Sequence, residues 1–182
     1  YAWACSPPVI VLRRIIPYHD YLPRKPFSKY REQPFKICTD TDALPVYHRN
    51  TFLSISGPLS NEFSDVALRD VNNRFLRFII KQGERGNYGV IESISDGRTF
   101  DLSSEDVGTD LGIVVKLRNS QAVERHVFVC AGIEKYGTSG AVWYLTNRWR
   151  QLYKEFGTGE FGLVVKVVRA QESLTTRVYT VK

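Results

Sequence analysis

Apolar residues recur along this chain with two different periods, which predict where strands and helices form. Alternating or continuous apolar positions over a short run are typical of strands, whereas apolar residues three and four positions apart are typical of one helix face. Strands are predicted at 51–57, 74–81, 88–94, 99–102, 112–118, 126–132, 163–168 and 176–181. The segment 126–132 is apolar almost throughout, so we expect that strand to be buried on both faces of its sheet.

Two segments have the helical period. The first, 62–71, is short and carries acidic residues in its first turn. The second runs through Val142 to Phe156 and is closed by Gly157. The N-cap candidates are Ser60 or Asn61 for the first helix and Thr138 or Ser139 for the second.

Each predicted helix follows a predicted strand, and a hairpin with an Asp96-Gly97 turn lies between these two strand–helix units. In α/β proteins, such units place their strands side by side and in the same direction. The order therefore predicts one α/β domain of three layers, with a largely parallel central sheet and a β-hairpin insertion.

The N-terminal segment differs from the rest in charge and in proline content. Between residues 13 and 37 lie seven basic and two acidic residues, a net +5 of the chain's +6. Four prolines in the same stretch prevent a long helix, so residues 1–34 are predicted to form an extended arm attached to a domain at 35–182. The candidate partner contacts in this arm are Arg24, Lys25, Lys29, Tyr30 and Arg31.

Two interpretations of the arm stay open. An extended segment that lays its aromatic side chains on its own domain or on a neighbouring subunit needs this composition, and we favour that interpretation. Basic residues interleaved with aromatic rings also suit single-stranded nucleic acid, with the charges on phosphates and the rings under bases.

Composition excludes several classes of protein. With 43% hydrophobic and 24% charged residues, the chain is neither disordered nor collagen-like nor a coiled coil. The longest apolar run, Pro7 to Leu12, is far too short for a membrane span. Because the chain begins at Tyr1 and contains no Met, we expect a fragment or a processed product, in a cytoplasmic or cell-surface location that the composition does not decide.

The cysteines and histidines show no spacing typical of a metal site, so neither a metal nor a cofactor is predicted. Cys38 and Cys130 both lie in apolar, strand-like runs. We expect each to be a small buried side chain rather than a nucleophile or half of a disulfide.

A candidate ligand crevice is predicted where two turns follow strands, at 56–61 and 131–140. Small residues at a helix N-terminus leave backbone N–H groups free to bind a phosphate or a carboxylate. The alternative is that these residues cap the helix and let it pack closely on the sheet. The candidate ligand-binding residues are Gly57, Asn61, Lys135, Gly137, Thr138 and Ser139.

Glu62 and Asp65 are the candidate catalytic residues, because carboxylates three positions apart lie on one helix face. Such a pair can act as acid and nucleophile in glycosyl transfer or hydrolysis, if an apolar wall raises the pKa of one of them. Acidic residues are also common in the first turn of a helix because they favour its dipole, and we prefer that explanation.

Read together, the two turns resemble a domain with a G-G-P-x-x-N and A-G-x-x-x-x-G-T-x-A-A pattern, known from archaeal surface-layer proteins and some bacterial regulatory or defence proteins. The resemblance covers about 51–168 and departs from the pattern at Ser56 and Gly140. It implies a Rossmann-like fold and a binding or assembly role. The matching residues are Gly57, Pro58, Asn61, Asp110, Gly112, Val114, Val115, Lys116, Asn119, Ala131, Gly132, Gly137, Thr138 and Ala141.

The leading hypothesis is a non-enzymatic binding or assembly module. It would dock onto a neighbouring chain, or form a homo-oligomer, through its arm, and it would hold a small anion at the crevice. The first alternative is an enzyme acting on a nucleotide-like ligand, for which segment 55–62 has a weaker resemblance to nucleoside deoxyribosyltransferases. The second alternative is nucleic-acid binding by the arm.

Overall fold

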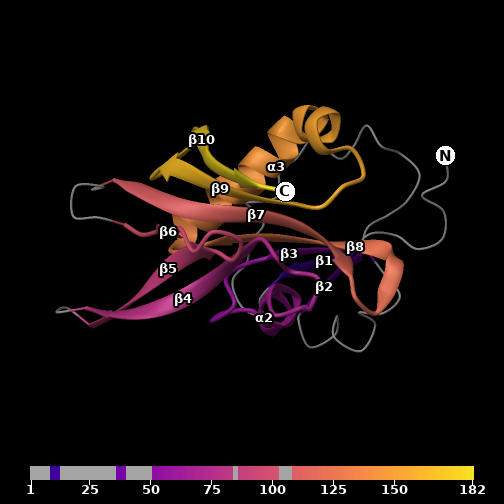
Figure 1. The fold of residues 1–182 in the computed structure, drawn as a ribbon. Helices are drawn as coiled ribbons and strands as arrows, with labels where there is room; N and C mark the ends of the chain where they lie inside the picture. The colour runs from indigo at the N-terminus through magenta and orange to yellow at the C-terminus, as the bar shows by residue number, and fades with distance from the viewer. Residues whose placement is uncertain (1–8, 13–35, 40–50, 84–85, 103–107) are drawn as a thin grey trace.

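The computed structural model describes residues 9–12, 36–39, 51–83, 86–102 and 108–182 (Figure 1). These residues form ten strands and two helices. The strands are β1 (Val9–Leu12), β2 (Lys36–Thr39), β3 (Phe52–Ile55), β4 (Leu76–Gly83), β5 (Gly86–Ser93), β6 (Thr99–Phe100), β7 (Thr109–Asn119), β8 (Ala122–Gly132), β9 (Phe161–Val168) and β10 (Gln171–Val181). The helices are α2 (Glu62–Leu68) and α3 (Lys135–Phe156).

Seven strands form the main sheet, in the order β10-β9-β7-β8-β3-β1-β2, and β4-β5-β6 form a second sheet. The pairings β10–β9, β9–β7 and β7–β8 are antiparallel, whereas β8–β3, β3–β1 and β1–β2 are parallel. Both pairings in the second sheet are antiparallel. The long central strands of the domain are therefore paired antiparallel, and parallel pairing is confined to β8 and the short strands beyond it.

The expectation of a Rossmann-like domain with a largely parallel sheet is wrong. The described chain is mostly β, with a mixed main sheet, a separate antiparallel sheet and two helices. The strand–helix–strand unit β8-α3-β9 does exist, and its two strands point the same way, but β7 lies between them in the opposite direction. The sheet is mixed rather than largely parallel because it contains the β7–β8 and β9–β10 hairpins, and strands joined by a short turn pair antiparallel.

Part of the predicted arm belongs to the main sheet. Residues 9–12 form β1, which pairs with β3 on one side and with β2 on the other. This segment is thus an interior strand of the sheet. The candidate contact residues Arg24, Lys25, Lys29, Tyr30 and Arg31 lie outside the described residues.

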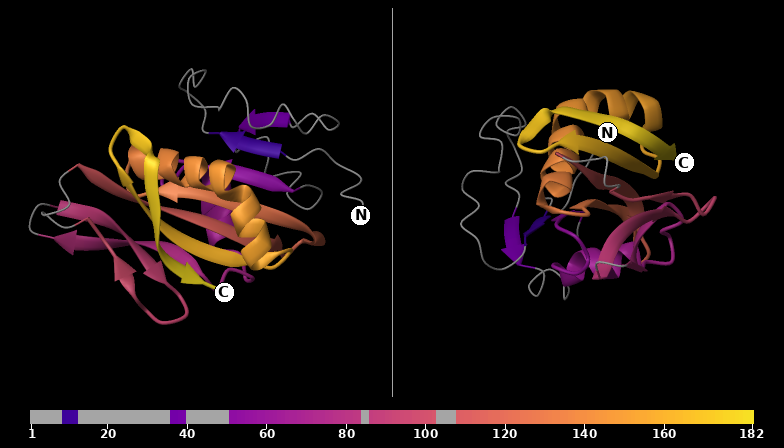
Figure 2. Two further views of the ribbon diagram at one scale, coloured as in Figure 1. Left: turned by 90° about the horizontal axis from the view of Figure 1, so that it is seen from above. Right: turned by 90° about the vertical axis from the view of Figure 1, so that its left-hand side faces the viewer.

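The main sheet is the middle of three layers, with α3 on one face and α2 together with the β4–β6 sheet on the other (Figure 2). Successive residues of a strand point to opposite faces. In β7, Ile113 and Val115 accordingly pack in the cluster with α2 and the second sheet, while Val114 packs in the cluster under α3. The apolar run of β8 is buried from Val127 to Ala131, which confirms that this strand is covered on both faces.

The helix ends agree with the predictions at two of three points. Asn61 caps α2 by accepting a hydrogen bond from the backbone N–H of Ser64, at 3.1 Å. Gly157 closes α3 with a positive φ of 58°. The prediction that Thr138 or Ser139 caps α3 is wrong, because the helix begins earlier, at Lys135, with Glu134 in the N-cap position and no side-chain cap from that residue.

Two buried groups in the cluster under α3 have unusual electrostatic surroundings. Cys130 is free and fully buried, as predicted, and burial raises the pKa of its thiol. Lys116 is 2% exposed, and its Nζ donates to the carbonyl of Gly157 at 3.4 Å and lies 5.9 Å from the ring centre of Phe128. Burial lowers the pKa of Lys116, and the charge of Glu160 acts in the opposite direction.

No helix of the described residues has the length and apolar character that a membrane span requires.

We expect Lys116→Met to stabilise the protein at neutral pH by about 1 kcal/mol or more, since a buried charge with one long hydrogen bond is replaced by an apolar side chain of similar length. This corresponds to a melting temperature higher by about 2–4 °C per kcal/mol. Calorimetry of the parent and of the variant measures the two melting temperatures.

Because the pKa of Lys116 is lower in the folded state, the unfolded state binds more protons above neutral pH, and the stability of the parent rises with pH. The difference should therefore shrink toward alkaline pH, and a less stable variant would contradict this account.

Candidate functional site

The two turns that follow β3 and β8 lie next to each other. The strands are parallel, with Ile55 opposite Cys130, so their carboxyl ends meet at one edge of the layer. The backbone N–H of Ser56 donates to the carbonyl of Cys130 at 3.0 Å. A Cβ atom placed on Gly57 would lie 3.5 Å from the carbonyl oxygen of Gly132. The predicted juxtaposition of segments 56–61 and 131–140 is therefore present.

Asp110 belongs to the start of β7, and its side chain lies against the N-terminus of α3. Its side chain is fully buried and accepts three backbone hydrogen bonds. Oδ2 accepts from Gly137 at 2.5 Å, and Oδ1 accepts from Leu111 at 2.7 Å and from Glu134 at 3.2 Å. Burial raises the pKa of Asp110, while these hydrogen bonds act in the opposite direction. A carboxylate from a distant strand thus takes the place of a local cap at the helix N-terminus.

Glycines bring the backbone of α3 into direct contact with β7 and β8. A Cβ on Gly137 would lie 2.1 Å from the carbonyl oxygen of Leu111, and a Cβ on Gly112 would lie 2.2 Å from the carbonyl oxygen of Gly137. On Gly132 it would lie 2.2 Å from the backbone nitrogen of Thr138. All three distances are far below van der Waals contact, so hydrogen is the only side chain that these positions accept.

The remaining candidates for anion binding at α3 are engaged within the protein or face solvent. Thr138 N donates to the carbonyl of Glu134 at 3.3 Å, as part of the first helical turn. Ser139 Oγ donates to the carbonyl of Tyr136 at 3.0 Å and hydrogen-bonds Glu172 of β10 at 2.8 Å. Lys135 is exposed, with Nζ 4.9 Å from the ring centre of Tyr136. The geometry therefore supports the interpretation in which these residues pack and fix the helix.

At the other turn, Asn61 and two serines form a buried polar cluster. Asn61 is 1% exposed, and its Nδ2 lies 3.5 Å from the carbonyl of Ile55. The hydroxyls of Ser54 and Ser64 are 2.6 Å apart, and Ser64 Oγ also donates to the carbonyl of Ser56 at 2.9 Å. Nothing in the sequence pattern singled out Ser54 or Ser64, whose small polar side chains resemble those of an ordinary strand or helix. Together these bonds tie α2 to the end of β3.

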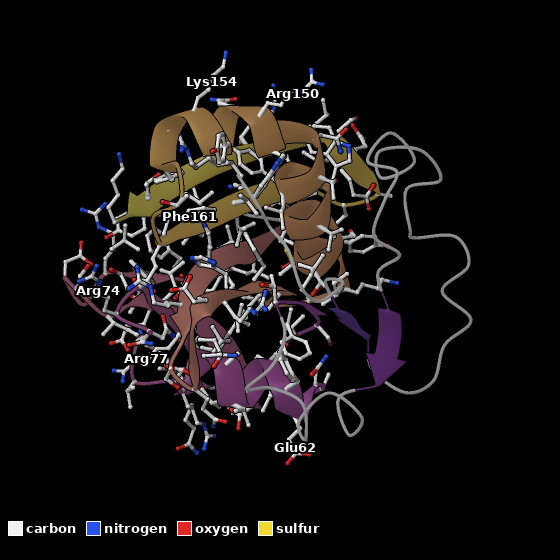
Figure 3. The ribbon with its side chains drawn as sticks, turned by 90° about the vertical axis from the view of Figure 1, so that its right-hand side faces the viewer. Glu62, Arg74, Arg77, Arg150, Lys154 and Phe161 are labelled. Carbon is white, nitrogen blue, oxygen red and sulfur yellow. The ribbon has the colours of Figure 1, made fainter. Side chains whose placement is uncertain are left out.

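The candidate catalytic carboxylates lie on the outer side of α2. Glu62 is exposed and projects away from the sheet (Figure 3). Asp65 forms an ion pair with Arg69, one helical turn later, at 3.0 Å. Within the described residues, His, Cys, Asp and Glu side chains form no group of three that could hold a metal ion.

A further feature, which the sequence pattern did not indicate, is the outer edge of β4. Phe75 O accepts from Ile94 N at 2.9 Å, so Phe75, next to the start of β4, directs its carbonyl toward the β5 side of the ladder. Because antiparallel pairs alternate, every second residue of β4 from Leu76 onward directs its N–H and C=O away from β5. Asn73 Nδ2 donates to the outward carbonyl of Leu76 at 2.9 Å. No hydrogen bond among the described residues engages the outward backbone groups of Phe78, Ile80 or Gln82.

Compared with known proteins, the chain matches no family model, no curated protein and no solved structure. The resemblance to the surface-layer pattern thus stays a prediction.

We expect Gly137→Ala to cost at least about 4 kcal/mol of folding free energy, because its methyl group would overlap the carbonyl of Leu111. Gly57→Ala is the matched control. Its methyl group would meet the neighbouring turn at an ordinary contact distance, so the change should stay within about 1 kcal/mol. Denaturant unfolding of both variants measures the two costs. Equal stability of the two variants would refute the backbone contact at α3.

Asp110→Asn should lower the free energy of unfolding by about 1–3 kcal/mol. The amide keeps one acceptor oxygen but turns its NH₂ group either toward the N–H of Gly137 or toward those of Leu111 and Glu134, which then lose their acceptor. Thermal unfolding measures this loss. An unchanged melting temperature would mean that the three hydrogen bonds of Asp110 do not hold the start of α3.

Proposed function

We propose that this chain is a non-enzymatic assembly module that associates with a second copy of itself along the edge of β4. The observation that carries the proposal is the row of outward backbone groups at Phe78, Ile80 and Gln82. An open strand edge is a template for a strand from another chain. The leading hypothesis from the sequence placed such docking in the arm, whereas the β4 edge offers a docking element among the described residues.

The β4 edge is regular and partly apolar. Its eight residues pair with β5 without a register shift, whereas β10, at the edge of the main sheet, has two register shifts. Irregular edges resist pairing with another strand, and regular ones accept it. Ile80 lies in the middle of the open row with 57% of its surface exposed, so pairing would bury an apolar side chain.

The three open residues are symmetric about Ile80, which favours a second copy as the occupant. A two-fold axis at Ile80 places Ile80 opposite its equivalent and Phe78 opposite Gln82, so every outward group finds a partner. The same register sets Ile79 opposite Lys81. Like charges therefore do not face each other across the axis, and the pairing has no electrostatic penalty of that kind.

The enzyme alternative has less support in the geometry. The carboxylates and hydroxyls near the two turns are bonded to the protein itself: Asp110 to α3, Asp65 to Arg69, and Ser64 to Ser54. The glycines of the second turn serve close packing of α3. These roles explain the motif residues without a substrate, in keeping with the binding or assembly role that the resemblance implies.

Ile80→Pro is expected to convert the dimer into a monomer, because proline lacks the outward N–H and blocks the approach of a strand. The ladder to β5 does not use that N–H, so the fold should survive. Light scattering over a range of concentrations measures the mass, which should be about twice 20.9 kDa for the parent and 20.9 kDa for the variant.

Two further variants test whether dissociation results from disturbing the β4 edge itself. Ile80→Val keeps the N–H and most of the apolar surface, so it should remain a dimer. Ile80→Lys keeps the N–H but sets like charges opposite each other at the two-fold axis, so it should dissociate, most strongly at low salt. A monomeric parent, or an Ile80→Lys variant as dimeric as the parent, would refute assembly through β4.

A further inference from the structure

The second half of α3 carries positive charge that no acidic side chain in the described part of the chain neutralises. Arg148, Arg150 and Lys154 are exposed, and none of them forms an ion pair among the described residues. The acidic residue of this half, Glu155, is already paired with Arg177 of β10 at 2.8 Å. Arg150 and Lys154 project from the helix away from the sheet (Figure 3). This surface therefore presents a local excess of cations to solvent.

The helix dipole does not account for all of these cations. Basic residues stabilise a helix C-terminus, but the effect falls off within the last turn. Lys154 is the basic residue in the last turn of α3, whereas Arg148 and Arg150 lie further from the end at Phe156. The two arginines are thus outside the reach of a capping role.

A row of aromatic rings runs beside the cations. The ring of Trp149 lies edge-on to Phe128 of β8, with centroids 5.8 Å apart, and 6.4 Å from the ring of Tyr153. Tyr153 is 52% exposed. Trp149 and Tyr153 are one helical turn apart and directly precede Arg150 and Lys154 in the sequence. The aromatic ridge and the cationic ridge therefore run side by side along α3.

We propose that this α3 basic face, defined by Trp149, Arg150, Tyr153 and Lys154, binds single-stranded nucleic acid. The exposed Tyr153 ring stacks on a base, while Arg150 and Lys154 contact the adjacent phosphates. A duplex keeps its bases stacked on each other and leaves the Tyr153 ring without a partner, so the face favours unpaired strands. This activity is independent of the β4 edge.

The test is fluorescence anisotropy with a labelled oligothymidylate of about 12 nucleotides, a length within the range that aromatic, basic surfaces cover. The parent should bind at low salt, and its affinity should fall as salt rises. Arg150→Glu with Lys154→Glu should weaken binding at least about tenfold, and Tyr153→Ser at least about fivefold.

A charge-matched control separates the surface from the net charge. Arg69→Glu with Arg74→Glu makes the same change in net charge on the α2 side of the molecule, and should leave affinity within about twofold of the parent. Equal weakening by this control, or no binding at low salt, would overturn the proposal. So would an unchanged affinity of Tyr153→Ser, or equally tight binding to a duplex of the same sequence or to phosphatidylserine vesicles, since each indicates a surface for anions in general.

Discussion

The contact of the α3 backbone with the backbones of β7 and β8 is the constraint on which the rest of the domain depends. It requires hydrogen at Gly112, Gly132 and Gly137, and it is fixed by the three hydrogen bonds that Asp110 accepts. Close approach of the first turn lays the following turns of α3 flat on the sheet, so Leu145 and Leu152 reach the apolar cluster beneath them. The burial of one sheet face under α3 and the exposure of the opposite face of this helix follow from where this turn is held.

Local features of the fold were predicted well because their causes are local. The period of apolar residues located the strands from β3 to β10 and the two described helices, although it missed β1 and β2. The caps at Asn61 and Gly157 depend on neighbours in the sequence. The pairing of strands depends on distant partners. That β7 lies between β8 and β9, and that β1 from the N-terminal segment pairs between β3 and β2, has no signature in the periodicity of either segment. The start of α3 was misplaced for the same reason, since its cap comes from Asp110, 27 positions before Gly137.

The candidate site shows the same division. The sequence correctly indicated that segment 131–140 needs small residues, but glycine serves close approach of a ligand and close approach of another backbone equally well. The distances decide between them, because the space beside Gly137 is filled by Leu111 and the space beside Gly132 by α3. The β4 edge and the α3 basic face were missed because both depend on which atoms are left uncovered after folding. An apolar strand and an amphipathic helix with a few basic residues look ordinary in a sequence.

The two proposed surfaces lie on opposite layers, with α3 on one side of the main sheet and β4 on the other (Figure 1). Pairing through β4 therefore leaves the α3 basic face of each copy uncovered. A two-fold dimer then carries two such faces, and a strand long enough to reach both is held at a high effective concentration by the second once the first has bound. Assembly and nucleic-acid binding would in that case reinforce each other without any contact between their surfaces. The rigid frame set by the glycine contacts is what would keep the two faces at a fixed separation.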